Sequence, residues 1–433
     1  MAKTADDLID FVNKSPSPYH AAGQAKDMAI AAGFEMIDEA DAWSLQPGGA
    51  YTLLRGGKTM AAFRVGTKPI AEAGARIIVA HTDSPVLKVK PRPAFKARDA
   101  GMLTAEIYGS PLLHTWLDRD LKLCGMVWTA DKKGHTHRKQ IELDDLSVRV
   151  NSLAPHLKTQ HKTEGVVLDR QKDLRLTFSK NKDGIVETLH GALREASGLK
   201  GEVISYDLCL ADKTPGGYAG ADKAFISAPR LDNLFSSYTA LKGLLADEGP
   251  TEATRMVVLY DAEEIGSTTW TGARSSLLDM LLSRINAHFG GKTEDNFRAR
   301  AKSILISADM AHSEHPSFKE ATDPDHVPSL NGGIAVKSSA MANYAIAHDA
   351  EAWFTHICQE AGLPVQRFMY RCDHGGGSSV GPITSTAIGM PGVDVGCPLL
   401  AMHSIREMAG TEDVDHAITA FRQAFMSDVP LTS

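Results

Sequence analysis

Two adjacent acidic residues, Glu263 and Glu264, closely follow an apolar run that is rich in β-branched residues. Two similar runs end in the same way, one just before His81 and Asp83 and the other just before Asp309. Short runs of this kind that end in polar loops are typical of buried strands. Ligand sites in open α/β sheets form outside the carboxyl ends of the strands. We therefore expect these acidic and imidazole side chains to gather at one edge of a sheet.

The residue types at these positions are those that bind zinc. Neutral imidazole nitrogen and carboxylate oxygen are common zinc ligands, and a two-metal hydrolase needs a carboxylate that bridges its ions. Each residue alone has a plainer explanation, since Asp232 and Asp309 could cap helices and a pair of acids is usually solvated. Several candidates at strand ends and helix starts nevertheless favour one shared metal site.

The elements that must position these residues alternate between apolar runs and amphipathic helices. Runs of strand character cover residues 77–80, 256–260, 304–306 and 392–396, and helical patterns cover 5–14, 20–32 and 231–245. Such alternation is typical of a largely parallel sheet that is covered on both faces. The sequence therefore predicts an α/β fold in which helices sandwich a mixed, mostly parallel sheet.

The middle of the chain has a different pattern. Residues 103–108, 175–178 and 203–208 alternate between apolar and polar side chains, and they are separated by Gly, Pro and charged turns. Prolines 91 and 93 and the Pro215-Gly-Gly sequence are candidate boundaries. We therefore predict one domain from residues 1–90 and 226–433, with a β-rich domain, residues 91–225, inserted into it.

Composition excludes several classes of protein. The chain has 433 residues and a net charge of −7, so it lacks the basic footprint of a nucleic-acid-binding protein. Its start lacks a secretory signal, and no apolar stretch approaches the roughly 18 residues that a membrane span needs. The five cysteines show no Cys-x-x-Cys spacing, so we expect neither a disulfide framework nor a thiolate metal site. These properties predict a cytoplasmic protein that binds neither nucleic acid nor membranes.

Five longer blocks of sequence resemble, in order along the chain, the M18 family of metallopeptidases, typified by aspartyl aminopeptidase. The blocks are His81-Thr-Asp83-Ser-Pro85, Ser227-Ala-Pro-Arg230-Leu-Asp232-Asn233, Asp261-Ala-Glu263-Glu264-Ile-Gly266-Ser267, Ser307-Ala-Asp309-Met310-Ala-His312 and Met402-His403-Ser404-Ile-Arg406-Glu407. The resemblance implies a metallo-aminopeptidase that cleaves the first residue, preferentially Asp or Glu, from peptides with a free N-terminus. It also implies that the inserted domain mediates dimerisation within a dodecamer.

The resemblance also implies a role for each matching residue. Two zinc ions per subunit, for which cobalt or manganese could substitute, would be held by His81 and Asp309 on one side, by Glu264 and His403 on the other, and by Asp232 between them. Glu263 would be the general base that activates water. Asp83 would orient the ligand His81 without binding metal.

Two further residues match the family outside the metal ligands. Lys337 falls where acid-selective members have a lysine that pairs with the side chain of a substrate Asp or Glu, although it could also be a surface lysine. His156 resembles a histidine that the neighbouring subunit contributes to the active site, where it would stabilise the oxyanion. If that is so, a monomer should be nearly inactive.

Other interpretations stay open at this point. Residues 371–381 depart from the family pattern at Cys372 and His374, which leaves specificity open, including a preference for neutral residues. An amidohydrolase or carboxypeptidase could use the same metal scaffold, and a non-catalytic scaffold is a third alternative. The pair His135 and His137 has metal-like spacing, but its charged neighbours predict a solvated hairpin.

Overall fold

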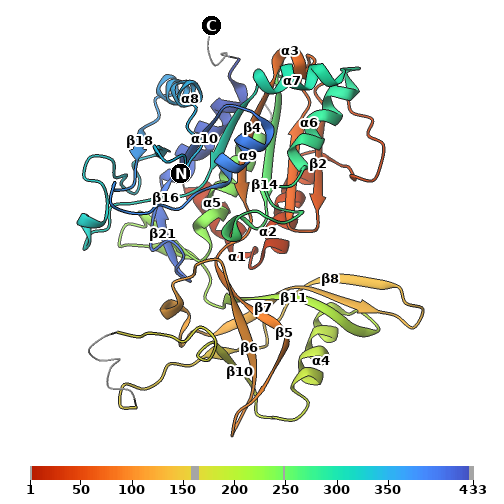
Figure 1. Ribbon diagram of the computed structural model, residues 1–433, viewed down its shortest axis with the longest axis vertical. Helices are drawn as coiled ribbons and strands as arrows, with labels where there is room; N and C mark the ends of the chain where they lie inside the picture. The colour runs from red at the N-terminus through yellow and green to blue at the C-terminus, as the bar shows by residue number, and fades with distance from the viewer. Residues whose placement is uncertain (1, 158–164, 247–248, 429–433) are drawn as a thin grey trace. The chain divides into compact units, whose positions relative to one another are not determined.

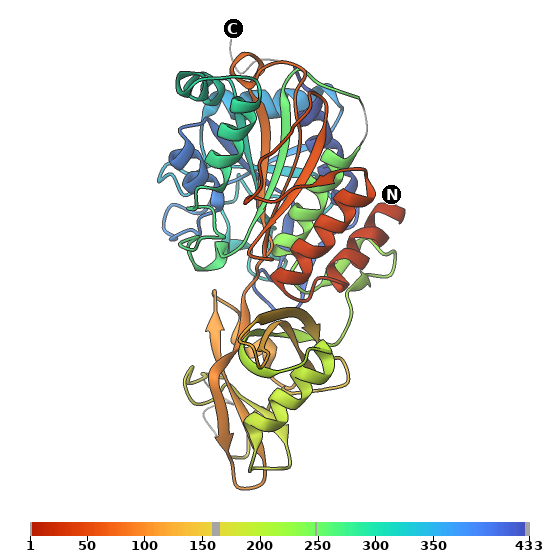
Figure 2. The same ribbon diagram turned by 90° about the vertical axis from the view of Figure 1, so that its right-hand side faces the viewer.

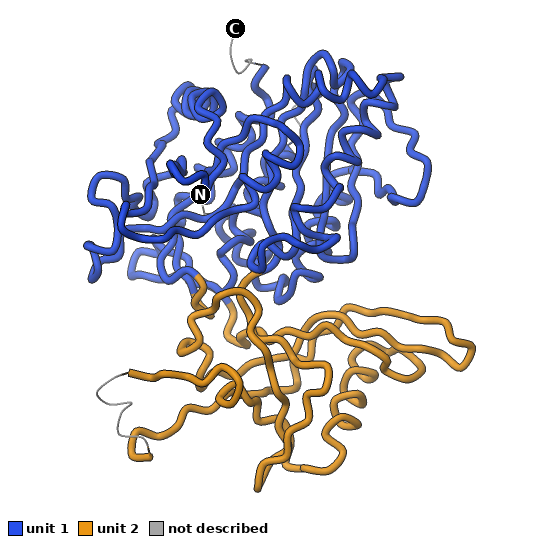
Figure 3. The backbone as a smooth tube through the Cα atoms, in the orientation of Figure 1, with its two compact units in different colours: residues 1–83, 216–402, 407–433 blue, residues 84–215, 403–406 orange. Residues whose placement is uncertain are grey.

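The chain folds into two compact units, which Figure 3 colours separately. The computed structural model describes residues 2–157, 165–246 and 249–428. Unit 1 contains Met1–Asp83, Gly216–Met402 and Glu407–Ser433, and unit 2 contains Ser84–Pro215 and His403–Arg406. The chain thus divides at 83/84 and 215/216, whereas the sequence predicted divisions at 90/91 and 225/226. The short segment 403–406 of unit 2 was not foreseen.

Both predicted divisions fall inside strands. Strand β5 (Val86–Lys96) runs through Pro91 and Pro93, at a shift in its register with the neighbouring β6 (Gly101–Tyr108). Proline is tolerated at such an irregularity because the ladder there does not need its missing N–H group. The second division falls within β13 (Phe225–Ala228) of unit 1. Pro91 and Pro93, which suggested a domain boundary, therefore mark an irregular point of a strand.

A nine-stranded sheet forms the centre of unit 1, with strands in the order β1-β2-β3-β14-β4-β15-β19-β17-β18. Its strands are β1 (Glu35–Met36), β2 (Ala50–Arg55), β3 (Thr59–Arg64), β14 (Thr254–Tyr260), β4 (Ala75–His81), β15 (Ile304–Ala308), β19 (Gly392–Gly396), β17 (Ile334–Lys337) and β18 (Val365–Phe368). Strands β14, β4, β15 and β19 are parallel neighbours, whereas β3 and β17, which flank this group, run antiparallel to β14 and β19. The predicted mixed, mostly parallel sheet is confirmed.

Helices cover both faces of this sheet, as the two views in Figures 1 and 2 show. On one face α1 (Ala2–Asn13), α2 (Pro18–Ala31), α5 (Leu231–Leu245), α8 (His348–Glu360) and α10 (Asp413–Met426) contribute to one apolar cluster. On the other face α3 (Ile70–Ala73), α6 (Leu277–His288), α7 (Thr293–Ala301) and α9 (Val380–Ile388) contribute to another. Successive residues of β4 alternate between the two clusters, so the whole strand is buried. Only its end is open to polar chemistry.

A smaller five-stranded sheet completes unit 1. Its order is β12 (Gly217–Ala219), β13, β21 (Glu407–Gly410), β20 (Pro398–Leu400) and β16 (Ala311–His312). Strand β16 comes soon after β15, and β20 soon after β19. The chain therefore enters this sheet directly after the carboxyl ends of two strands of the large sheet. None of the helices in the described parts of the chain has the length and apolar character that a bilayer span requires.

Unit 2 is built on a seven-stranded antiparallel sheet, which is accompanied by helix α4 (Ile185–Ser197). The strand order is β8 (Thr136–Glu142), β7 (Leu121–Ala130), β11 (Glu202–Asp212), β5, β6, β10 (Arg175–Ser179) and β9 (Arg149–Val150). The hairpin of β7 and β8 carries His135 in its turn and His137 in β8, and their side chains are 69% and 52% exposed near Asp131. The prediction of a solvated hairpin is confirmed.

Candidate metal centre

Three neighbouring strands of unit 1 end at the same edge of the sheet and deliver most of the predicted site residues. His81 is the last residue of β4, and it pairs with Tyr260, the last residue of β14. Glu263 and Glu264 follow in a short 3₁₀ turn. Asp309 follows β15, which pairs with β4 on the opposite side. Parallel pairing thus brings together residues that are far apart in sequence.

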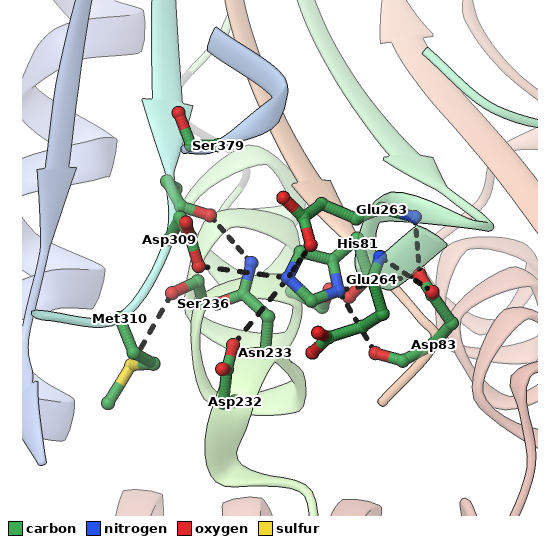
Figure 4. Close-up of polar contacts among 12 residues, drawn as sticks. His81, Asp83, Asp232, Asn233, Ser236, Glu263, Glu264, Asp309, Met310 and Ser379 are labelled. Carbon is green, nitrogen blue, oxygen red and sulfur yellow. Dashed lines mark hydrogen bonds and ion pairs between the residues drawn. The ribbon is translucent and has the colours of Figure 1, made fainter. Parts of the chain in front are cut away.

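The imidazole of His81 lies at the centre of this group, with carboxylates around it (Figure 4). Its Nε2 atom is 3.5 Å from Oδ1 of Asp232, 3.7 Å from Oδ1 of Asp309 and 4.0 Å from Oε2 of Glu263. Asp232 comes from the first turn of α5. The side chains of Glu263 and Glu264 leave the same turn in different directions. Adjacent acids can therefore have different roles.

The donor atoms of this group suit a divalent cation such as zinc. One ligand atom from each of His81, Asp232 and Glu264 can be chosen so that all three lie within 4.8 Å of one another. Imidazole nitrogen and carboxylate oxygen are the mixture that zinc accepts, at distances of about 2.0–2.2 Å from the ion. Atoms at this mutual spacing can surround one ion. The residues present therefore fit the metal that their types predict.

The electrostatics of the group also favour a cation. Burial raises the pKa of Glu263 to about 8, and burial together with Asp232 raises the pKa of Glu264 well above its usual value. Burial lowers the pKa of His81, but its contacts with Asp232, Asp309 and Asp83 outweigh that effect and raise it well above 6.5. The buried acids are therefore more readily protonated than acids in water. A cation with two positive charges would stabilise their ionised forms.

Asp83 orients both the histidine and the two acids. Its backbone carbonyl O lies 2.9 Å from Nδ1 of His81, and because a carbonyl can only accept, Nδ1 carries the proton. Nε2 then faces the carboxylates, where it can bind a metal ion once it has released its own proton. The Asp83 carboxylate accepts the backbone N–H groups of Glu263 and Glu264 at 3.1 and 3.2 Å. One residue therefore fixes a ring tautomer and the turn beside it.

Comparison with known proteins identifies the family of the chain. A family model described as "Aminopeptidase I zinc metalloprotease (M18)" matches residues 11–425. The chain belongs to the M18 family of aminopeptidases. It is 37% identical to a probable M18 family aminopeptidase 2 of Stutzerimonas stutzeri over 430 residues, which cover 98% of each chain. A relative of the same description from Clostridium novyi is 36% identical, again over 98% of each chain.

Solved structures of relatives share the whole fold. The structure of Chaetomium thermophilum mApe1 has a TM-score of 0.87 with this chain at 29% identity, covering 98% of this chain and 97% of that one. A structure described as the mApe1 dodecamer of S. cerevisiae has a TM-score of 0.82 at 27% identity, covering 97% and 96%. The predicted family and fold class are therefore confirmed, and the protein is an aminopeptidase of a zinc metalloprotease family.

Three polar residues that contact the elements of the candidate metal centre had no predicted role. The carboxylate of Glu407, which is 2% exposed, accepts the backbone N–H of Asp232 at 2.9 Å. The hydroxyl of Ser237 donates to the carbonyl O of His81 at 2.7 Å, and the side-chain amide of Asn233 donates to the carbonyl O of Ala308 at 2.8 Å. Two of them stand in the sequence blocks that resemble the family, but a block alone does not tell a ligand from its support.

Lys337, at the end of β17, is almost completely buried and lies beside the metal centre. Its Nζ atom is 3.3 Å from Oδ2 of Asp309, donates to the carbonyl O of Met310 at 3.0 Å and lies 4.9 Å from the centre of the Tyr344 ring. Burial lowers the pKa of Lys337, but the charges of Asp309 and Asp394 outweigh it and the pKa is raised. The residue is therefore a buried cation rather than a surface lysine.

The two remaining predicted site residues belong to unit 2. His403 is in the segment His403–Arg406, where its Nδ1 lies 3.1 Å from the carbonyl O of Ser110. A carbonyl partner again requires the proton on Nδ1, which leaves Nε2 as a possible ligand atom. His156 lies in an exposed turn of unit 2. The roles of both histidines stay predictions.

Proposed function

We propose that this M18 aminopeptidase uses two zinc ions to remove an N-terminal Asp or Glu from peptides, with Glu263 as the general base. The observation that carries the proposal is the arrangement of His81, Asp232, Asp309 and Glu264 around one point, with the carboxylate of Glu263 beside it. A fifth ligand, His403, comes from the family resemblance. When bound, the zinc ions would polarise the scissile carbonyl and make a nucleophilic water available near neutral pH.

The residues of the chain divide the remaining work. Glu263 would accept the proton of the attacking water and transfer it to the leaving amine. Its side chain is 15% exposed, whereas that of His81 is 1% exposed, so the base is the member of this pair that substrate and water can reach. Asp83 keeps the base in place through the backbone of the turn.

The preference for acidic residues rests on Lys337. A buried ammonium next to the metal centre would pair with the carboxylate of a substrate Asp or Glu, and it would repel a basic side chain. In the absence of substrate, this ammonium pairs with Asp309. Substrate binding would therefore add a second carboxylate to a cation that already has one.

Self-association through unit 2 would complete the active site. The described residues on either side of His156 include four exposed apolar side chains, Leu153, Leu157, Val166 and Val167, with exposures between 47% and 74%. Exposed apolar residues that are close in sequence are typical of a surface that another chain covers. One relative is a dodecamer, as the description of its structure states. We propose that this segment carries His156 to the active site of a neighbouring copy.

A panel of aminoacyl chromogenic substrates with zinc, cobalt or manganese tests the reaction and its specificity together. We expect Asp and Glu substrates to be cleaved faster than Ala, Leu and Lys substrates, and N-acetyl-Asp substrates not to be cleaved. Faster cleavage of neutral residues would contradict the role of Lys337. Cleavage of the acetylated substrate would contradict an aminopeptidase mechanism and favour an amidohydrolase on the same scaffold.

A further inference from the structure

A second lysine, Lys58, makes a buried ion pair just outside the metal centre. It lies in the turn between β2 and β3, and its Nζ atom is 2.9 Å from Oδ2 of Asp261. The Asp261 side chain is 2% exposed and that of Lys58 is 23% exposed. Asp261 stands two residues before Glu263. In the sequence this lysine is part of a Gly-Gly-Lys turn, which by itself predicts only a solvated hairpin.

The turn that carries Lys58 is joined to both strands that deliver the metal centre. The backbone carbonyl O of Lys58 accepts the hydroxyl of Thr82, the residue after His81, at 2.7 Å. The hydroxyl oxygen of Thr59 accepts the backbone N–H of Asp261 at 3.0 Å. Thr271 donates to the same carboxylate oxygen of Asp261 that Lys58 contacts, at 2.9 Å. The ammonium is therefore held where the end of β4 meets the end of β14.

We propose that Lys58 is a positioning residue for the reaction, which holds Glu263 in place by neutralising Asp261. The Asp261 side chain is buried two residues before Glu263, and Lys58 and Thr271 bind the same oxygen of its carboxylate. The backbone N–H of Asp261 is bound by Thr59, the residue after Lys58. Without the ammonium, the buried carboxylate of Asp261 would lose its charged partner, and its movement toward other partners would displace the backbone of the turn that carries Glu263. This inference rests on the proposed role of Glu263 as the base.

The alternative is that the ion pair only stabilises the fold. Single and double substitutions of its two residues distinguish this role from the positioning role. Removing one partner of a buried pair leaves an uncompensated charge, whereas replacing both partners is often nearly neutral. A displaced base slows the chemical step, and misplacement by about 1 Å can cost on the order of 100-fold in rate. Loss of an interaction that acts only in the transition state lowers kcat and leaves KM unchanged.

The experiment measures kcat, KM, zinc content and melting temperature of the full-length protein with an aminoacyl substrate. For Lys58→Met we expect kcat to fall about 10- to 100-fold, with KM within about twofold and zinc content unchanged. Lys58→Arg keeps the charge and should recover most of kcat. The double variant Lys58→Met with Asp261→Asn should recover kcat as well, because no uncompensated charge remains. The control is Lys68→Met, which removes an equally short but exposed ion pair with Glu252, and it should leave all four values unchanged.

Wild-type kcat in Lys58→Met would overturn the inference. So would a fall in kcat that follows a loss of zinc or of folded protein, or a double variant no faster than Lys58→Met. Glu263→Gln, assayed in parallel, tests the proposed base separately from the role of Lys58. If Glu263→Gln retains full activity with zinc bound, the proposed base itself is wrong. If Glu263→Gln is inactive and Lys58→Met is normal, only the role of Lys58 is wrong.

Discussion

The two units of this protein use their strands in different ways. The central strands of unit 1 are buried along their whole length between two layers of helices, so polar chemistry is confined to their ends. In unit 2 several antiparallel strands have exposed positions, and β8 is exposed at its first five residues. A sheet covered on both faces concentrates functional groups at one edge. A sheet with exposed strands instead presents side chains to solvent along the strands.

The histidines illustrate this difference. His81 ends a buried strand and is held by the backbone of Asp83, with three carboxylates within 4.0 Å of its Nε2. His135 and His137 have the same spacing as a pair of ligands, but they lie on an exposed hairpin with Asp131 as their shared acidic neighbour. Residue type and spacing alone therefore do not define a metal site. Burial and the convergence of strand ends do.

Removal of Asp232, the proposed bridging acid, should have the largest effect. Asp232→Asn would replace a carboxylate oxygen that faces His81 by a neutral group, so we expect loss of bound zinc and of nearly all activity. Metal analysis after gel filtration and a substrate assay would measure both. Asp279→Asn, at a partly exposed ion pair between α6 and Arg300 of α7, is the matched control and should retain metal. Full zinc content in Asp232→Asn would exclude this aspartate as a ligand.

Glu263→Gln should leave the metal in place and remove the proton acceptor. General acid–base catalysis contributes about 10²- to 10⁴-fold, so we expect kcat to fall by that factor while zinc content and oligomeric state stay unchanged. Steady-state kinetics on metal-loaded enzyme would measure the fall. Activity near that of the wild type would show that another group activates the water.

Lys337→Met should change specificity more than it changes the chemical step. We expect kcat/KM for an Asp substrate to fall about 10- to 100-fold, with a smaller change for an Ala or Leu substrate. The ratio of the two values is the measurement. An equal fall for all substrates, accompanied by loss of zinc, would instead mean that Lys337 serves only to hold Asp309, which it contacts at 3.3 Å.

Much of the fold followed from sequence because local patterns and long-range packing agree. The helix at 231–245 and the strand at 392–396 have the predicted bounds, and the other central strands differ from prediction by a few residues at their ends. Their apolar runs are continuous enough to predict strands that are buried on both faces of the sheet. The ends of the inserted unit were harder, because Pro91 and Pro93 lie inside a strand rather than in a linker.

The site was predictable to the extent that its residues end strands or stand in family blocks. His81, Glu263, Glu264 and Asp309 end or follow strands, and Asp232 begins a helix, so topology alone brings them together. Lys58 had no such signal, and Glu407 stands in a family block that does not reveal its contact. Glu407 acts through a backbone N–H, and Lys58 comes from a turn that joins the site only through packing. Long-range contacts of this kind are not encoded in local spacing.

The smallest effect is expected from substitution of the two histidines of unit 2 that have metal-like spacing. The side chains of His135 and His137 are exposed, and the carboxylate of their partner Asp131 accepts the backbone N–H groups of Lys133 and His135. Substitution of both histidines by Ala should therefore leave zinc content, kcat and KM unchanged and alter stability by less than about 0.5 kcal/mol. Metal analysis, steady-state kinetics and thermal unfolding would measure these values. A loss of zinc or of activity would mean that an exposed pair of histidines can bind metal without the convergence of buried strand ends, and the contrast between the two units would no longer hold.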